Sequence, residues 1–298
     1  MSMSETPFHS GFIALLGRPN VGKSTLVNRL VGSKVSIVSD HPQTTRRRIS
    51  GVVGGPGFQL VLLDLPGFQK PFDSLTSRMQ ATVDSALSEV DAALVMFNAA
   101  EDLGGGDRFI AEATVASGVA FVCVLNKVDA VSPVMCSRRL AAAEHLVGEG
   151  RVTPMSAKRG DGVGDTVAAL MALMPEGPRY FPEGATSDQP LELLVAELVR
   201  EQALRVARDE LPHAIAVHVD EIRERPGDGL IEIDALLYVE SESQKPILIG
   251  KGGRTIKQIG SAARHEIETV LGARVFLSLR VKVRRHWRRD DAAVERFL

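Results

Sequence analysis

The stretch GRPNVGKST, residues 17–25, decides the fold of the first half of this sequence. It has the pattern G-x-x-x-x-G-K-[ST], and it lies between the apolar run Phe12 to Leu16 and a helical pattern. Backbone N–H groups of such a loop converge on an anion together with the N-terminus of the following helix. The stretch predicts a P-loop, with an ordinary glycine turn as the alternative. The predicted contacts to the nucleotide come from Asn20, Val21, Gly22, Lys23, Ser24 and Thr25.

Two further segments fit a phosphate and Mg²⁺ site. Lys23 would neutralise the β- and γ-phosphates, and the Ser24 hydroxyl is a hard oxygen ligand for Mg²⁺. Asp64 ends the apolar run from Gln59, which places its carboxylate at the same sheet edge as the P-loop, where it can hold a water of the Mg²⁺ shell. The Gly67 N–H, three residues on, can meet the γ-phosphate.

The polar segment Pro42 to Arg46, PQTTR, supplies a threonine for the Mg²⁺ shell. We expect Thr45 to be that ligand, and its neighbour Thr44 is the alternative. The predicted metal ligands are therefore Ser24, Thr45 and, through water, Asp64, and the predicted catalytic residues are Lys23, Thr45 and Gly67.

The segment Asn126-Lys127-Val128-Asp129 indicates which base is bound. The Asp129 carboxylate can accept two parallel hydrogen bonds from guanine N1–H and its 2-amino group, which adenine cannot supply. Asn126 would support the P-loop and the base, and Lys127 would cover the base plane. In Ser156-Ala157-Lys158, the Ala157 N–H would bind guanine O6. The predicted nucleotide is GTP or GDP.

Phe68 occupies the position where many GTPases have a glutamine that orients the attacking water, and Gln69 comes one step later. Hydrolysis should therefore be slow and depend on positioning and charge neutralisation. Asn20 is either an ordinary turn residue or an oxygen ligand for K⁺ beside the phosphates.

Apolar strands alternate with helical patterns from Phe12 to Met174, which predicts an α/β domain with a mostly parallel sheet. The Pro- and Gly-rich stretch PEGPRYFPEGATSDQP, residues 175–190, is typical of a linker. A helix-strand-strand-helix-helix-strand order follows and predicts a smaller α+β domain. The predicted organisation is a tail over 1–9, a GTP-binding domain over 10–175, a linker over 176–190 and a second domain over 191–298.

The second domain carries the pattern G-x-x-G at Gly250 to Gly253, between two short helices. This is the signature of a KH module of the type II order, in which a tight turn brings backbone close to single-stranded nucleic acid. Ile249 and Ile256 are expected to line the groove. The predicted RNA contacts are Ile249, Gly250, Lys251, Gly252, Gly253, Arg254, Lys282, Arg284 and Arg285.

The charge distribution supports a polyanionic partner. Residues 245–289 hold twelve Lys and Arg against two Glu, a local net charge of +10 in a chain whose net charge is −2. The stretch KVRRHWRR, residues 282–289, would add phosphate contacts and a stacking surface at Trp287. A solvated basic tail is the competing interpretation.

The composition, with 44% hydrophobic and 24% charged residues, is that of a soluble globular protein. The N-terminus has no signal-peptide pattern, and no apolar run approaches the roughly 20 residues that span a bilayer. We therefore expect a cytoplasmic protein. Two cysteines, Cys123 and Cys136, do not predict a disulfide framework or a zinc site.

From Phe12 to its end the chain resembles the bacterial Era GTPase family. GRPNVGKST, PQTTR, DLPG with F-x-K-P, NKVD and SAK look like its nucleotide motifs, and IGKGG with VKVRRHW looks like its KH end. DLPG stands where the family usually has DTPG. The resemblance implies binding to the 3′ end of 16S rRNA, a role in 30S subunit assembly and a loose, peripheral association with the inner face of the cell membrane. No obligate protein partner is evident.

Two classes of function stay open at this point. In the first, the protein is a GTP-hydrolysing switch whose nucleotide state controls RNA binding. In the second, it is an RNA chaperone or a membrane-associated cell-cycle regulator in which hydrolysis is secondary.

Overall fold

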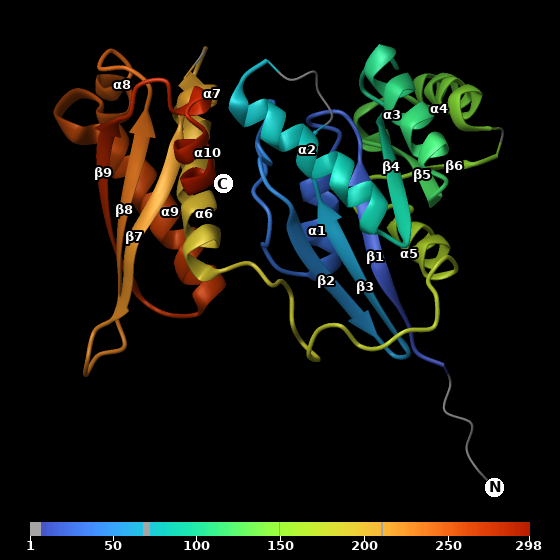
Figure 1. The fold of residues 1–298 in the computed structure, drawn as a ribbon, viewed down its shortest axis with the longest axis horizontal. Helices are drawn as coiled ribbons and strands as arrows, with labels where there is room; N and C mark the ends of the chain where they lie inside the picture. Colours follow the sequence, from blue (N-terminus) through green and yellow to red (C-terminus); the bar gives the residue numbers. More distant parts are fainter. Residues whose placement is uncertain (1–6, 68–71, 149, 210) are drawn as a thin grey trace, which may run out of the picture. The chain divides into compact units, whose positions relative to one another are not determined.

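The computed structural model describes residues 7–67, 72–148, 150–209 and 211–298, which form two units (Figure 1). Unit 2 takes in the described residues of Ile37–Thr44, Pro71–Arg78 and Gln189–Leu298, and unit 1 takes in the others. None of the described helices combines the length and the apolar composition that crossing a membrane requires.

Unit 1 is built on a sheet whose described strands lie in the order β2-β3-β1-β4-β5-β6. All neighbouring strands pair in parallel except β2, which is antiparallel to β3. The prediction of a mostly parallel sheet is therefore confirmed. The strands are β1 His9–Leu16, β2 Ile49–Gly55, β3 Phe58–Asp64, β4 Ala92–Asn98, β5 Ala120–Asn126 and β6 Val152–Pro154.

Helices cover both faces of this sheet, because its strands are apolar on both sides. One apolar core joins the sheet to α2, α3 and α4, and a second core joins its other face to α1 and α5 (Figure 1). The helices are α1 Lys23–Val31, α2 Ser74–Glu89, α3 Gly105–Ser117, α4 Pro133–Val147 and α5 Val163–Met171, with a short 3₁₀ turn η1 at Val128–Ala130.

Strand β2 follows the polar segment Pro42 to Arg46 and was not among the strands expected from the sequence. Its sequence, ISGVVGG, contains three glycines, which are depleted in strands. Gly51 has a packing reason to be there, since a Cβ on it would lie 2.6 Å from Val27 Cγ1 of α1. Close approach of helix and strand therefore explains why a residue that looks like a strand breaker is part of the sheet.

The Pro- and Gly-rich stretch after α5 lies along unit 1, and we call residues 175–188 the strap. The side-chain amide of Gln59 donates to the Phe181 carbonyl and accepts from the Phe181 N–H, both at 2.9 Å. The Val52 N–H donates to the Thr186 carbonyl at 2.9 Å. The Ser187 hydroxyl donates to the carbonyl of Ser50 at 2.7 Å. A segment whose composition is typical of a flexible linker is thus held by specific hydrogen bonds.

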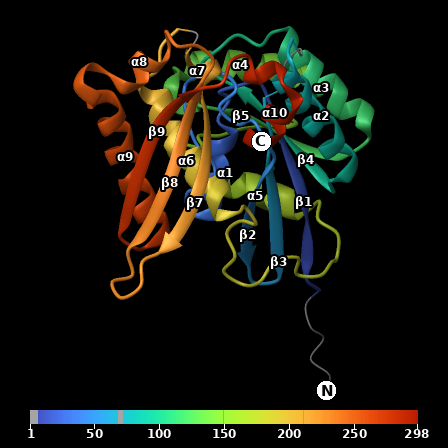
Figure 2. The same ribbon diagram turned by 60° about the vertical axis from the view of Figure 1, so that its left-hand side comes forward.

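Unit 2 has a sheet in the order β7-β8-β9, with β7 antiparallel to β8 and β9 parallel to β8. Figure 2 shows α6 and α9 along one face of this sheet, where they share its core. The element order confirms the predicted type II KH order. The elements are α6 Leu191–Val206, α7 Leu211–Ala214, β7 Ala216–Glu224, β8 Ile231–Val239, α8 Lys245–Ile249, η2 Lys251–Gly253, α9 Arg254–Leu271 and β9 Val275–Val283.

Helix α9 shows why this order forms. Its apolar residues Ile256, Ile259, Ala263, Ile267 and Val270 recur at three- and four-residue spacing and face the core, and Gly272 ends the helix with φ 63°. Its exposed positions are polar or basic. One face of the helix therefore builds the core of the domain while the other is exposed and polar.

The chain after β9 is folded rather than a solvated tail. A 3₁₀ turn, η3 Trp287–Arg289, leads into α10, Asp291–Phe297. Trp287 is 0% exposed, and its Nε1–H donates to the Ala214 carbonyl at 2.8 Å. Its ring contacts Phe297 edge to face at a centroid distance of 5.3 Å. The prediction that Trp287 stacks on RNA bases is wrong, since the indole is part of the core of unit 2.

Candidate functional site

The P-loop runs from the end of β1 to the start of α1, as the motif predicted. Gly22 has φ 106°, and a Cβ there would lie 2.3 Å from Asn126 Nδ2, so that only glycine fits both the backbone and the space. Asn126, at the end of β5, donates through Nδ2 to the Val21 carbonyl at 2.7 Å. The predicted support of the P-loop by Asn126 is thus seen in the structure.

The ammonium group of Lys23 lies against the backbone of the P-loop. Its side chain is 6% exposed, and Nζ donates to the Gly17 carbonyl at 3.0 Å and to the Arg18 carbonyl at 3.3 Å. Burial lowers the pKa of Lys23 to about 8, although the nearby Asp64 carboxylate acts in the opposite direction. A buried cation with backbone carbonyls as partners would gain from a phosphate group at the same place.

Three oxygen-bearing side chains converge beside Lys23. Ser24 Oγ and Thr45 Oγ1 lie 3.1 Å apart, and Thr45 Oγ1 donates to Asp64 Oδ2 at 3.5 Å. Asp64 is 0% exposed, and its Oδ1 has no hydrogen-bond partner among the described residues. Burial raises the pKa of Asp64, and the Lys23 ammonium partly offsets this.

This donor set fits Mg²⁺. Hydroxyl and carboxylate oxygens are the ligands that Mg²⁺ prefers, and the buried Asp64 Oδ1 is an acceptor whose desolvation a water of the metal shell would compensate. Bound there, Mg²⁺ would neutralise charge on the β- and γ-phosphates. Ser24 and Thr45 are the residues placed to ligate it directly.

The structure distinguishes the two candidate threonines. Thr44 Oγ1 donates to the His41 carbonyl at 2.6 Å, whereas Thr45 reaches Ser24 and Asp64. This geometry favours Thr45. Gly67 packs against the P-loop, since a Cβ on it would lie 2.8 Å from the Pro19 nitrogen. The contact of its N–H with the γ-phosphate stays a prediction.

The base-binding residues form one connected network. Asp129 Oδ1 accepts a hydrogen bond of 2.6 Å from Ser156 Oγ, and the Ala157 N–H donates to Asn126 Oδ1 at 2.8 Å. Lys127 has φ 65°, a left-handed conformation that turns the chain between β5 and η1. The two segments predicted to recognise guanine therefore lie side by side, at the edge of the sheet that carries the P-loop.

Of the residues expected to control hydrolysis, Asn20 lies among the described residues and Phe68 and Gln69 do not. Phe68 and Gln69, like the rest of the F-x-K-P motif, lie outside the described residues. Asn20 lies in the P-loop with φ 61°, a conformation in which asparagine is well tolerated. Its role as a K⁺ ligand stays a prediction.

The G-x-x-G segment forms a tight turn between α8 and α9. Gly250, Gly252 and Gly253 all have positive φ, at 73°, 61° and 77°. A Cβ on Gly252 would meet no atom within 4 Å, so this side of the turn is open. The backbone can therefore approach a ligand closely here, as the KH signature predicts.

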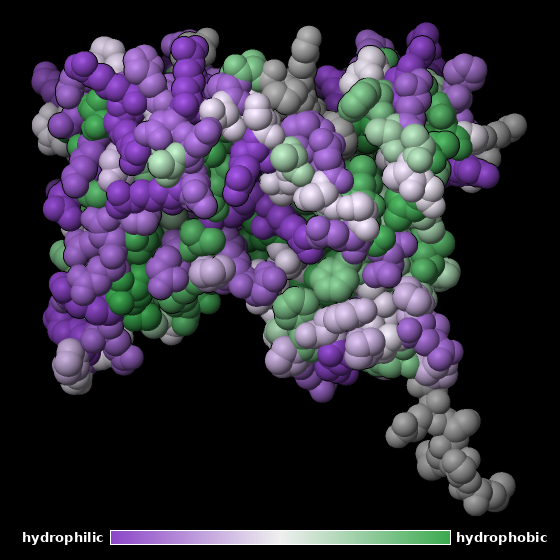
Figure 3. Space-filling model, viewed as in Figure 1, coloured by the Kyte–Doolittle hydropathy of each residue, from purple (hydrophilic) through white to green (hydrophobic). Residues whose placement is uncertain are grey.

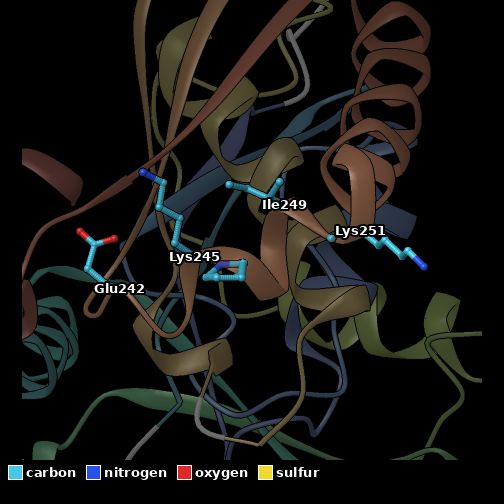
Figure 4. A pocket seen from close by; sticks show the side chains of 6 residues that line it. Glu242, Lys245, Ile249 and Lys251 are labelled. Atoms are coloured by element: carbon cyan, nitrogen blue, oxygen red, sulfur yellow. The ribbon is translucent and has the colours of Figure 1, made fainter.

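A cavity of about 470 Å³ lies beside this turn. Figure 4 shows Ile249 at the cavity, with Lys251 extending away from Glu242 and Lys245. Ile256, which was predicted to line the groove with Ile249, is not among the lining residues; both isoleucines pack partly against the core of unit 2. The cavity is lined by Glu242, Lys245, Pro246, Ile249, Gly250 and Lys251.

The predicted RNA contacts differ in how accessible they are. Lys251, Gly252, Arg254, Lys282 and Arg285 are exposed. Arg284 is partly buried and pairs with Asp290 at 2.8 Å, so part of its charge serves the fold of the C-terminal segment. Hydrophilic side chains predominate at the end of unit 2 that carries α8 (Figure 3).

Two further residues of the nucleotide site were not predicted from the sequence. Ser36, 1% exposed, donates its hydroxyl to Asp64 Oδ2, and Arg29 of α1 donates to the carbonyls of Ala157 and Lys158. Neither belongs to a motif with fixed spacing. Arg29 is a basic residue in the last turn of the P-loop helix, which does not by itself indicate a contact with Ala157 and Lys158.

Two family models match the chain. The model described as "50S ribosome-binding GTPase" matches residues 12–127, and the model described as "KH domain" matches residues 210–288. GTPase Era of Mycobacterium tuberculosis (strain H37Rv) is 46% identical over 296 residues, which covers 98% of this chain and 99% of the relative. GTPase Era of Mycobacterium avium is 45% identical over 295 residues, with the same coverage.

Two solved structures match nearly the whole chain. One is Era in complex with MgGDPNP and nucleotides 1506–1542 of 16S ribosomal RNA, with a TM-score of 0.93 and 37% identity, covering 97% of this chain and 98% of that one. The other is an Aquifex aeolicus Era variant bound to GDP and AlF₄⁻, with the same TM-score and identity and coverage of 97% and 99%. By its sequence, its two domains and its fold, the chain belongs to the Era family of GTPases.

Proposed function

We propose that this protein is a GTP-hydrolysing switch that binds the 3′ end of 16S rRNA through its KH domain and acts in assembly of the 30S ribosomal subunit. The observation that carries the proposal is the match over 97% of the chain to Era with MgGDPNP and 16S rRNA nucleotides 1506–1542. The bound nucleotides are GTP and GDP with Mg²⁺. We assign the GTP-binding domain to residues 10–175, the connection to 176–190 and the KH domain to 191–298.

The chemistry that we propose uses the residues described above. Lys23 and the P-loop N–H groups hold the phosphates, Ser24 and Thr45 ligate Mg²⁺ directly, and Asp64 holds it through water. Asn126, Asp129 and Ala157 hold the base, with Lys127 over its plane. Because these groups position the phosphates but supply no strong base, intrinsic hydrolysis should be slow.

We place the protein in the cytoplasm, the compartment that contains both GTP and ribosome precursors. A peripheral association with the inner face of the cell membrane stays a prediction from the family resemblance. Flotation of the purified protein with anionic lipid vesicles tests it, and recovery of the protein only in the unbound fraction would argue against it.

Crosslinking in cells followed by RNA sequencing tests the proposed RNA partner. We expect the reads to accumulate on the 3′ end of 16S rRNA, because the KH turn and its basic neighbours favour one single-stranded segment. A Gly252→Asp strain serves as the control, since it should lose this accumulation at equal protein level. Reads spread evenly over cellular RNA in the native strain would contradict the proposal.

A second test concerns the rate of hydrolysis. Because the sequence has Phe68 where many GTPases have the glutamine that orients water, turnover should be ~10⁻⁴ to 10⁻² s⁻¹. K⁺ should raise it above the rate in Na⁺ if the Asn20 oxygen holds a cation beside the phosphates. Asn20→Gly keeps the positive φ and removes that oxygen, so K⁺ and Na⁺ should become equivalent for this variant. Equal rates in the native protein would rule out Asn20 as a K⁺ ligand.

A further inference from the structure

Arg29 joins the P-loop helix to the loop that follows β6. Its Nε donates to the Ala157 carbonyl and its Nη2 donates to the Lys158 carbonyl. The loop makes room for the guanidinium at Gly160, where a Cβ would lie 3.0 Å from Arg29 Nη1. Arg29 is exposed on its outer side, so this contact is a local clasp between two parts of unit 1.

The clasp determines where the N–H groups of the loop point. The Ser156 carbonyl accepts from the Gly160 N–H at 2.7 Å, so the three successive carbonyls of Ser156, Ala157 and Lys158 are all bound by Arg29 or Gly160. No peptide bond in the described chain is cis. In a planar trans peptide the C=O and the next N–H point in opposite directions. Fixing these carbonyls therefore fixes the N–H groups of residues 157–159 in the opposite sense.

The opposite side is where the base-binding residues lie. The Ala157 N–H donates to Asn126 Oδ1 at 2.8 Å, and the Arg159 N–H donates to Ser156 Oγ at 3.0 Å. The same Ser156 hydroxyl is bound to Asp129, the predicted partner of the guanine 2-amino group. The Lys158 N–H lies between these two N–H groups along the chain. A base held by Asp129 would therefore find its O6 near the Lys158 N–H and near the Ala157 N–H, which would share its hydrogen between O6 and Asn126 Oδ1.

We infer that Arg29 is a positioning residue for guanine recognition, which holds the loop so that the Ala157 and Lys158 N–H groups meet O6. This inference rests on the proposed GTP binding. Arginine suits the task because its planar guanidinium offers several donors in a fixed arrangement, whereas lysine is a single flexible point charge. The same helix begins with Lys23 and Ser24, so α1 couples the phosphate end of the site to the base end.

The test compares three nucleotides that differ only at the base. Inosine diphosphate keeps O6 and N1–H and lacks the 2-amino group, and 2-aminopurine riboside diphosphate keeps the 2-amino group and lacks both O6 and N1–H, so each variant is compared with the native protein for the same nucleotide. Arg29→Met preserves the side-chain stem and removes the donors. It should weaken GDP and inosine diphosphate by the same factor, roughly three- to tenfold for a hydrogen bond of ordinary strength. Binding of the 2-aminopurine nucleotide should change less than about twofold.

Calorimetric titration in Mg²⁺ measures these affinities, with Arg138→Met as the matched control because Arg138 is an exposed arginine in α4. Arg29→Lys should recover part of the loss, because it keeps one donor on a flexible stem. If Arg29→Met fails to fold, Arg29→Lys and Arg29→Gln provide the same comparison. Equal loss for all three nucleotides would mean that Arg29 only stabilises the domain, and would overturn the inference.

The outcome for the native protein separates this inference from the proposed function. If the native protein binds ADP as tightly as GDP, guanine recognition itself is wrong and the proposed function fails. If it prefers GDP and Arg29→Met shows no dependence on O6, only the role of Arg29 is wrong.

Discussion

Asp129→Asn should convert this protein from a guanine-binding into a xanthine-binding protein. The carboxylate is expected to accept hydrogen bonds from guanine N1–H and the 2-amino group. The amide N–H₂ of an asparagine would face that amino group, so that two hydrogen-bond donors would meet. Loss of two charge-assisted hydrogen bonds, at about 1.5–3 kcal/mol each, would weaken GDP by roughly 10²- to 10⁴-fold. Xanthosine diphosphate carries an oxygen at position 2 and should bind the variant better than GDP does.

The fold should tolerate this change. Asp129 Oδ1 accepts from Ser156 Oγ, and the asparagine carbonyl oxygen can accept the same bond. Asp165→Asn, an exposed site in the first turn of α5, is the matched control and should leave both affinities unchanged. Titration calorimetry with GDP, xanthosine diphosphate and ADP gives the comparison. A variant that still prefers GDP over xanthosine diphosphate would show that another group reads the base.

Gly252→Asp should abolish selective RNA binding while leaving GTP hydrolysis intact. Gly252 has φ 61°, which aspartate adopts more readily than most residues, and its Cβ would enter open space. The fold should therefore survive, and the new carboxylate would face the RNA backbone. Like charges in such a contact cost several kcal/mol, so we expect a loss of roughly 10²-fold or more in affinity.

Two control variants accompany this test. One changes the size of the residue at the turn without adding charge, and the other removes charge from the segment after β9. Gly252→Asn has the same size without the charge and should lose much less affinity. Arg285→Ala with Arg289→Ala removes two exposed charges and should weaken all RNAs alike, flattening the plot of log K against log salt by about 1.4. Filter binding over a salt series measures both effects. Native affinity and selectivity in Gly252→Asp would move the RNA surface away from this turn.

The nucleotide site could be predicted from sequence because its chemistry requires certain residues at short spacing. Lys23 and Ser24 follow a glycine whose backbone no other residue fits, and Asp64 and Asn126 end apolar strands. Parallel strands that end at one edge of a sheet bring these groups together whatever the loops do. The structure accordingly places them around the P-loop, where Ser24 reaches Asp64 through Thr45 and Asn126 binds the Val21 carbonyl.

Features that depend on contacts between distant segments could not be predicted. Trp287 looked like a surface aromatic because it lies among arginines, yet it pairs with the Ala214 carbonyl and with Phe297. The glycines of β2 concealed a strand that pairs with β3 and packs against α1 at Gly51. Arg29 acts on carbonyls far along the chain, and no local pattern marks such a contact.

The strap also occupies backbone groups of β2 that could otherwise pair with a strand of another copy. β2 lies at the end of its sheet, and its outer backbone would offer unpaired N–H groups to a strand from another copy. The Thr186 carbonyl accepts a hydrogen bond from the Val52 N–H, and the Ser187 hydroxyl donates one to the Ser50 carbonyl of the same strand. A GTP-binding fragment ended at residue 175 would uncover this edge and become prone to aggregate, whereas one ended at residue 188 would keep it covered.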